Sequence, residues 1–198
     1  MRQAIQGTLD DLERQRLDEP GQGHRDSDDR MFACGPETGR FLNTLIHAAR
    51  AKRVLEIGGS MGYSTIWMAE AVQSNGGQLV TMERLPHKAV MLRERIAQAG
   101  VEDTVQLQEG DALSIIPGLD GLWDFVFVDA WKDDYPTYFD LAFSRLAICG
   151  LMVADNITHP NPPGAGIEAY LAKARTRTDA QSQLIPIGSG VELTIRLG

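Results

Sequence analysis

Apolar and polar positions along the chain follow two periods, one typical of helices and one typical of buried strands. Ile5, Leu9 and Leu12 recur every three to four residues, so the sequence predicts a helix over residues 1–16. A second helix should begin at Gly35, where Gly-Pro-Glu-Thr precedes an apolar stripe. That stripe consists of Phe41, Leu42, Leu45, Ile46 and Ala49.

From residue 53 onward, strand-like runs alternate with helix-like runs. The expected strands are 53–57, 78–83, 105–109, 123–129 and 151–155. The expected helices are 63–73, 87–99, 112–116, 135–148 and 167–177. Several of the strands are apolar almost throughout, as expected when helices cover both faces of a sheet. This alternation implies right-handed crossovers and a parallel sheet.

The end of the chain departs from this alternation. Two β-rich runs flank Gly188-Ser189-Gly190, which predicts a hairpin with an antiparallel edge strand. The expected fold is therefore α/β, a Rossmann-like doubly wound sheet, mostly parallel with an antiparallel C-terminal hairpin strand and helices on both faces. At 198 residues the chain should form one domain. Residues 31–198 form its main part, and residues 1–30 add a helix and a polar loop over 18–30 that we expect to order with ligand.

Composition narrows the possible partners. The net charge of −8 and a pI near 5.0 argue against nucleic acid, whereas a small or cationic ligand is easily accommodated. No apolar run approaches the ~20 residues needed to cross a bilayer. The N-terminus mixes charges throughout, unlike a secretory signal, and two cysteines without a pairing pattern fit a reducing cytoplasm. We therefore expect a cytoplasmic protein without a membrane partner, and a homodimer is left open.

A glycine turn after the first expected strand favours a nucleoside ligand. Gly58 allows a sharp turn, and Gly62 lets the backbone approach a ligand closely. Glu83 ends the next strand, where a carboxylate can accept both ribose hydroxyls. The alternative for the glycines alone is a turn kept for helix–strand packing. Glu83 in register beyond them favours the ligand.

Glu56 favours a methyl donor over a dinucleotide. A dinucleotide site usually reads G-x-G-x-x-G and holds a pyrophosphate, whereas this turn reads G-G-x-x-G with a negative charge just before it. A carboxylate there would repel a pyrophosphate, but it can accept a hydrogen bond from the ammonium of S-adenosylmethionine. The alternative for Glu56 is a carboxylate that caps loop amides. Asp111, after the third strand, could accept from the adenine amino group or simply cap the next helix.

Two acids and an amide follow neighbouring strands. Asp129 ends one expected strand, and Asp155 and Asn156 end the next, so all three should converge at the strand tips. Oxygen ligands without His or Cys select a hard cation, most simply Mg²⁺, with Mn²⁺ or Ca²⁺ as alternatives. The competing interpretation is that these acids cap the helices that follow. The histidines are too scattered along the chain to form a metal site.

Lys132 lies about one turn beyond Asp129. A nearby divalent cation would disfavour its ammonium form, so that Lys132 could act as a general base toward an acceptor hydroxyl. The alternative is a solvated lysine at the start of a helix. We find neither a G-x-S-x-G nucleophile motif nor a C-x-x-C pair.

The chain resembles the catechol and caffeoyl-CoA O-methyltransferase family of class I S-adenosylmethionine enzymes. The resemblance runs from about residue 31 to the C-terminus and rests on LEIGGSMGYS, MER, GDA, VDAWKDDY and ADN. It implies that residues 31–198 form the methyltransferase domain. It also implies that Asp129, Asp155 and Asn156 bind the cation and that Lys132 is the base. The implied cofactor contacts are Cys34, Glu56, Gly58, Gly59, Ser60, Ser64, Glu83, Asp111, Ala112, Asp129 and Trp131.

Two departures from the family concern the acceptor. The catechol enzymes carry a further acid near the C-terminal strands that holds the second hydroxyl, and the matching stretch here has Gln183. The longer N-terminal segment and the recognition insertion of the caffeoyl-CoA enzymes are not apparent.

The function expected is metal-dependent transfer of a methyl group to one hydroxyl of a small catechol-like aromatic acceptor. Transfer should be in line, with the cation holding two adjacent acceptor oxygens while Lys132 takes a proton. The alternatives are a metal-independent methyltransferase acting on another acceptor, an NAD-dependent oxidoreductase, and a cofactor-binding protein without turnover.

Overall fold

The computed structural model describes residues 2–18, 30–159 and 161–198. The elements, in chain order, are α1 (Gln3–Asp18), α2 (Gly35–Ala49), β1 (Arg53–Ile57), α3 (Tyr63–Ser74), β2 (Gln78–Glu83), α4 (Pro86–Ala99), β3 (Val105–Glu109), α5 (Ala112–Ile115), η1 (Ile116–Gly118), β4 (Trp123–Val128), η2 (Lys132–Asp134), α6 (Tyr135–Phe143), β5 (Leu146–Ala154), α7 (Ala165–Thr176), β6 (Ala180–Ile185) and β7 (Val191–Arg196). The loop expected over 18–30 lies, apart from its two end residues, outside the described residues.

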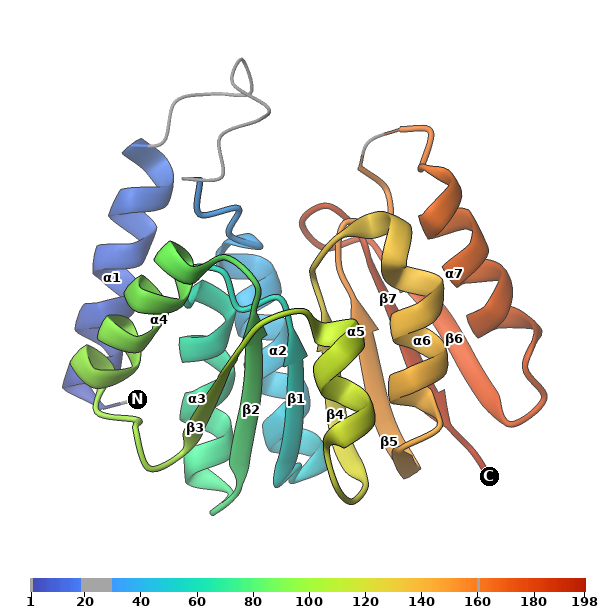
Figure 1. The fold of residues 1–198 in the computed structure, drawn as a ribbon, viewed down its shortest axis with the longest axis horizontal. Coiled ribbons are helices and arrows are strands. Elements are labelled where there is room, and N and C mark those ends of the chain that lie inside the picture. The colour runs from blue at the N-terminus through green and yellow to red at the C-terminus, as the bar shows by residue number, and fades with distance from the viewer. Residues whose placement is uncertain (1, 19–29, 160) are drawn as a thin grey trace.

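Seven strands form a single sheet in the order β3-β2-β1-β4-β5-β7-β6 (Figure 1). The strands from β3 to β5 are parallel to one another, and β7 runs antiparallel to both β5 and β6. The predicted fold class, including the antiparallel C-terminal hairpin, is confirmed. Because the first five strands are parallel, their carboxyl ends meet at one edge of the sheet.

Helices cover both faces of the sheet, and alternate residues of each strand pack against opposite layers. On β1, Val54 belongs to a core shared with α1, α2, α3 and α4, whereas Leu55 and Ile57 belong to a core shared with α6 and α7. Helix α1 packs against α4 and α3 on the outer side of the first layer (Figure 1). Among the described residues, no helix is long and apolar enough to span a membrane.

One boundary prediction is wrong. The sequence predicts a helix over 135–148 and a strand that starts at residue 151, but α6 ends at Phe143 and β5 begins at Leu146. Leu146 is buried and pairs with Trp123 ahead of a register shift between β4 and β5. Ile148, which extends the apparent apolar stripe of the helix, is 66% exposed. Tertiary pairing with β4 therefore overrides the local helical pattern. The other elements lie within a few residues of their predicted bounds.

Candidate active site

The carboxyl ends of the parallel strands border a cavity of about 500 Å³. Its walls come from the segments that follow β1 to β5 and from the segment before α2. The lining residues are Met31, Phe32, Ala33, Cys34, Gly58, Gly59, Ser60, Tyr63, Ser64, Met82, Glu83, Arg84, Leu85, Lys88, Gly110, Asp111, Ala112, Asp129, Ala130, Trp131, Lys132, Asp133, Tyr138 and Asn156. All the predicted site residues are among them except Glu56 and Asp155, which are buried.

The glycine turn between β1 and α3 forms one wall of the cavity. Gly58 has φ +96°, and a Cβ built on it would lie 2.3 Å from the carbonyl oxygen of Asp129. Any side chain here would therefore push apart the ends of β1 and β4. The amides of Gly58 and Gly59 donate to the carbonyl of Met82 at 3.1 and 2.9 Å, which ties the turn to the end of β2. Gly58 is therefore required for backbone packing, the alternative considered for the glycines, and the turn also lines the cavity.

Glu56 is fully buried below this turn. Its carboxylate accepts hydrogen bonds from the hydroxyls of Ser64 (2.5 Å), Thr65 (2.5 Å) and Thr81 (2.6 Å). Burial raises the pKa of Glu56 to about 7, although the three hydroxyls act in the opposite direction. Its partners are hydroxyls, not the loop amides of the alternative interpretation. Ser64 connects this buried acid to the cavity wall.

Glu83 and Asp111 lie at the ends of β2 and β3. Glu83 accepts the backbone amides of Ser60 (2.8 Å) and Leu85 (2.7 Å), which holds its carboxylate at the cavity wall. Asp111 caps α5 by accepting the amide of Leu113 at 3.1 Å. Asp111 therefore has the capping role considered for it, and it also lines the cavity.

The two predicted strand-end acids lie side by side. Val128 of β4 pairs with Ala154 of β5, so the next residues, Asp129 and Asp155, follow adjacent strand ends. Oδ1 of Asp155 accepts the amide of Asn156 at 2.7 Å, whereas Oδ2 is buried without a hydrogen-bond partner. Burial, and then the charge of Asp129, raise the pKa of Asp155 to about 7.

A buried oxygen without a partner, beside a second carboxylate, fits a bound cation. Asn156 adopts φ +58° and lines the cavity. Within residues 2–18, 30–159 and 161–198, no group of three or more His, Cys, Asp and Glu side chains has a metal-binding arrangement. Asp129, Asp155 and Asn156 offer two carboxylates and one amide, and Asp129 and Asn156 line the cavity.

Lys132 extends its amine along the same edge. Nζ donates to Oδ1 of Asp129 at 2.8 Å, to the carbonyl of Ala130 at 3.1 Å and to the hydroxyl of Tyr135 at 3.0 Å. The side chain is 32% exposed and lines the cavity. Lys132 is therefore an anchored side chain, not the freely solvated lysine of the alternative interpretation.

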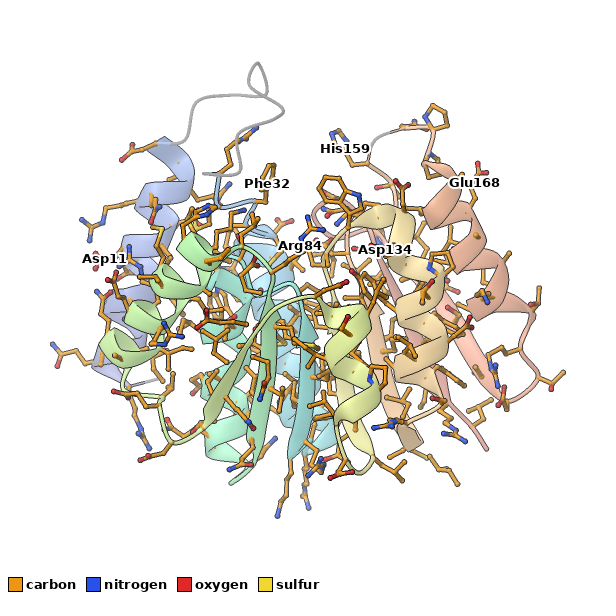
Figure 2. The ribbon with its side chains drawn as sticks, in the orientation of Figure 1. Asp11, Phe32, Arg84, Asp134, His159 and Glu168 are labelled. Atoms are coloured by element: carbon orange, nitrogen blue, oxygen red, sulfur yellow. The ribbon has the colours of Figure 1, made fainter. Side chains whose placement is uncertain are left out.

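Two exposed aromatic residues and a cation lie at the rim. Trp131 is 62% exposed and Phe32 is 54% exposed, although both line the cavity. The guanidinium of Arg84 lies 5.6 Å from the ring centroid of Trp131. Figure 2 shows Phe32 and Arg84 at the same end of the molecule as Asp134. Cys34 occupies the N-cap position of α2 without a side-chain capping bond, and it also lines the cavity.

Other residues of the site were missed by sequence reasoning. Thr65 and Thr81 bind Glu56, and Thr81 could have been found because it pairs with Glu56 between β1 and β2. Tyr135, which contacts Lys132, reads in sequence only as a core residue of a helix. Gln183, the counterpart of the family's acceptor-binding acid, lies exposed on β6 and does not line the cavity.

Known proteins resemble this chain in sequence and in fold. Residues 17–162 match the model of a family described as O-methyltransferase. A catechol O-methyltransferase of Niastella koreensis is 42% identical over 165 residues, which cover 75% of this chain and 74% of that protein. A caffeoyl-CoA O-methyltransferase of Eucalyptus globulus is 30% identical over 187 residues, which cover 84% and 76%.

Among solved structures, the O-methyltransferase TomG of Streptomyces achromogenes, in complex with S-adenosylmethionine, superposes with a TM-score of 0.80. It is 31% identical, and the superposition covers all of this chain and 91% of TomG. The likeness thus extends over the entire sheet and both helical layers.

Proposed function

This chain belongs to the O-methyltransferase family and uses S-adenosylmethionine, and from that premise we propose that its acceptor is a small aromatic molecule with two adjacent hydroxyls. We further propose that a divalent cation, most simply Mg²⁺, takes part. The observation that carries the proposal is the unpartnered Oδ2 of Asp155 beside Asp129, whose own Oδ1 accepts a hydrogen bond from the anchored Lys132.

The cofactor would lie along the glycine turn. Glu83 supports binding of the ribose hydroxyls, and Ser64 with the buried Glu56 supports binding of the ammonium group. Asp111, Ala112 and Trp131 also line the cavity, and we place them beside the adenine and the transferring region. Cys34, Gly58, Gly59 and Ser60 complete the cofactor site that we propose.

Asp129, Asp155 and Asn156 would hold the cation. Bound there, it would supply positive charge that holds two adjacent acceptor oxygens and favours loss of a hydroxyl proton. The same charge would weaken the hold of Asp129 on the Lys132 ammonium and favour the neutral amine.

Lys132 would act as the general base. Its neutral Nζ takes the proton of one acceptor hydroxyl, and that oxygen forms a bond to the methyl carbon as the carbon–sulfur bond breaks. The products are a methyl ether and S-adenosylhomocysteine, with the proton left on Lys132. The chain contributes mainly by positioning the reactants and placing charge around them.

The acceptor's shape tests this proposal. With Mg²⁺ and labelled S-adenosylmethionine, catechol should be methylated, whereas phenol and catechol monomethyl ether should react at least about 100-fold more slowly, because one oxygen cannot be both held and freely presented. Product formation is measured by mass spectrometry at matched concentrations. Equal rates for phenol and catechol would refute adjacent-hydroxyl recognition and favour a metal-independent methyltransferase.

Glu56 should make cofactor binding depend on pH. The pKa of Glu56 is about 7 in the unliganded protein, above its ordinary value of 4.5. A bound ammonium group favours the carboxylate, so binding must release a proton below pH 7. The affinity for S-adenosylhomocysteine should therefore fall by up to about tenfold per pH unit as the pH drops from 7 toward 5.

The stability of the unliganded protein should depend on pH in the opposite direction. Burial favours the protonated Glu56, so this contribution to stability is fully present below about pH 4.5 and is lost as pH rises through 7. Titration calorimetry with S-adenosylhomocysteine measures the first effect, and thermal unfolding of the unliganded protein measures the second, each for wild type and Glu56→Gln between about pH 5 and pH 8. A pH-independent affinity in wild type would contradict the assignment of Glu56 to the ammonium group.

A further inference from the structure

Tyr135, the first residue of α6, places a buried hydroxyl where several parts of the site meet. The residue is fully buried, with 0% of its surface exposed. Its oxygen lies 3.0 Å from Nζ of Lys132, 3.1 Å from the carbonyl oxygen of Val128 and 3.2 Å from the carbonyl oxygen of Asp155. One hydroxyl thus contacts the amine and the backbone at the ends of both β4 and β5.

The hydrogen bonds of the amine account for all its protons. A lysine ammonium has three N–H donors, and here they meet Asp129, the carbonyl of Ala130 and Tyr135. All three acceptors lie within three residues of Lys132. Asp129 and Ala130 precede it after the end of β4, whereas Tyr135 follows it as the first residue of α6, so the amine is held from both sides along the chain.

A hydroxyl suits both protonation states of the amine. Tyr135 accepts an N–H from the ammonium while donating its own proton to the carbonyl of Val128 or Asp155. Toward a neutral amine the same hydroxyl can rotate and donate. The amine therefore keeps this partner before and after it takes a proton, and Tyr135 itself neither gains nor loses one.

The ring that carries this hydroxyl is held by packing. Tyr170 of α7 meets it edge-on with ring centroids 5.7 Å apart, and Tyr138 lies at 6.4 Å. The backbone of Lys132 is packed closely as well, since a Cβ on Gly166 of α7 would lie 2.2 Å from the Lys132 carbonyl oxygen. Helices α6 and α7 thus fix both the backbone and the amine of this lysine.

We propose that Tyr135 is a positioning residue, whose hydroxyl holds the Lys132 amine toward the acceptor and keeps it beside the ends of β4 and β5. This inference rests on the proposed function, in which Lys132 is the base. It extends that function by assigning the orientation of the base to a buried tyrosine at the start of α6.

Tyr135→Phe tests the proposal because it removes the hydroxyl and keeps the ring. With saturating S-adenosylmethionine, Mg²⁺ and catechol, kcat should fall about 10- to 100-fold. The affinity for S-adenosylhomocysteine and the KM for catechol should stay within about twofold of wild type. The matched control is Tyr170→Phe, another buried hydroxyl on the same aromatic cluster without a contact to Lys132, and its kcat should match wild type.

A double-mutant cycle separates positioning from a general structural role. If Tyr135 acts through Lys132, then Tyr135→Phe should change kcat by less than about twofold in a Lys132→Ala background. If its effect multiplies with that of Lys132→Ala, the hydroxyl acts elsewhere and the proposal fails. Assays run below the unfolding temperature of the complex with S-adenosylhomocysteine, so that every variant is folded when measured.

The two levels of inference can fail separately. Wild-type kcat in Lys132→Ala would overturn the proposed base itself. A large defect in Lys132→Ala together with wild-type kcat in Tyr135→Phe would overturn only the assignment of Tyr135.

Discussion

Replacing Lys132 with alanine should lower kcat by roughly 10²- to 10⁴-fold, the range expected for a positioned general base. The amine lies on the cavity wall, held by Asp129, Ala130 and Tyr135. Alanine leaves the acceptor hydroxyl without a nearby group to take its proton. The affinity for S-adenosylhomocysteine should change little, because Lys132 is assigned to the acceptor side of the cavity.

Two further measurements separate base catalysis from electrostatic support. The defect of Lys132→Ala should shrink as pH rises, because the hydroxyl can then lose its proton to water. Lys132→Arg should remain defective near neutral pH, since a guanidinium keeps its charge. The matched control is Lys173→Ala, which removes an exposed lysine paired with Asp140 between α6 and α7. Full activity in Lys132→Arg would show that charge, not proton transfer, is the role of this side chain.

Asp155→Asn should have opposite effects on activity and on the stability of the metal-free protein. Oδ2 of Asp155 is buried without a partner beside Asp129, so the carboxylate is costly until a cation is bound. The neutral amide should therefore raise the melting temperature in EDTA. It should also weaken binding of Mn²⁺ and lower kcat at least about 100-fold at fixed Mg²⁺.

The control for this substitution is Asp140→Asn, at an exposed acid far along α6. It should leave Mn²⁺ binding and kcat unchanged. Mn²⁺ affinity is measured by electron paramagnetic resonance and stability by thermal unfolding. If Asp155→Asn lowers the melting temperature in EDTA and leaves Mn²⁺ binding intact, Asp155 serves the fold and does not bind a cation.

Much of the cavity could be predicted because parallel topology brings strand ends together. Asp129 and Asp155 are far apart in sequence, yet each ends an apolar run, and parallel neighbours must place such ends side by side. Gly58, which follows β1, and Glu83, which ends β2, could be placed at the same edge for the same reason. The resemblance to known methyltransferases implied a role for each of the residues that the topology brings together.

The remaining features depend on contacts that a linear pattern does not contain. Tyr135 occupies an apolar position of α6, and only the packing of that helix brings its hydroxyl to Lys132. The partners of Glu56 come from α3 and from β2, and hydroxyl hydrogen bonds leave no periodic signal. The start of β5 at Leu146 likewise depends on pairing with β4. Side-chain hydrogen bonds and strand pairing therefore had to be read from the structure.

Metal removal tests the proposed chemistry most directly. The protein is stripped with EDTA, and methyl transfer from labelled S-adenosylmethionine to catechol is followed as Mg²⁺ or Mn²⁺ is added back. We expect no transfer in EDTA and recovery with either cation, while binding of S-adenosylhomocysteine to the stripped protein stays intact. Undiminished turnover in EDTA would contradict the metal site at Asp129, Asp155 and Asn156 and leave a metal-independent methyltransferase.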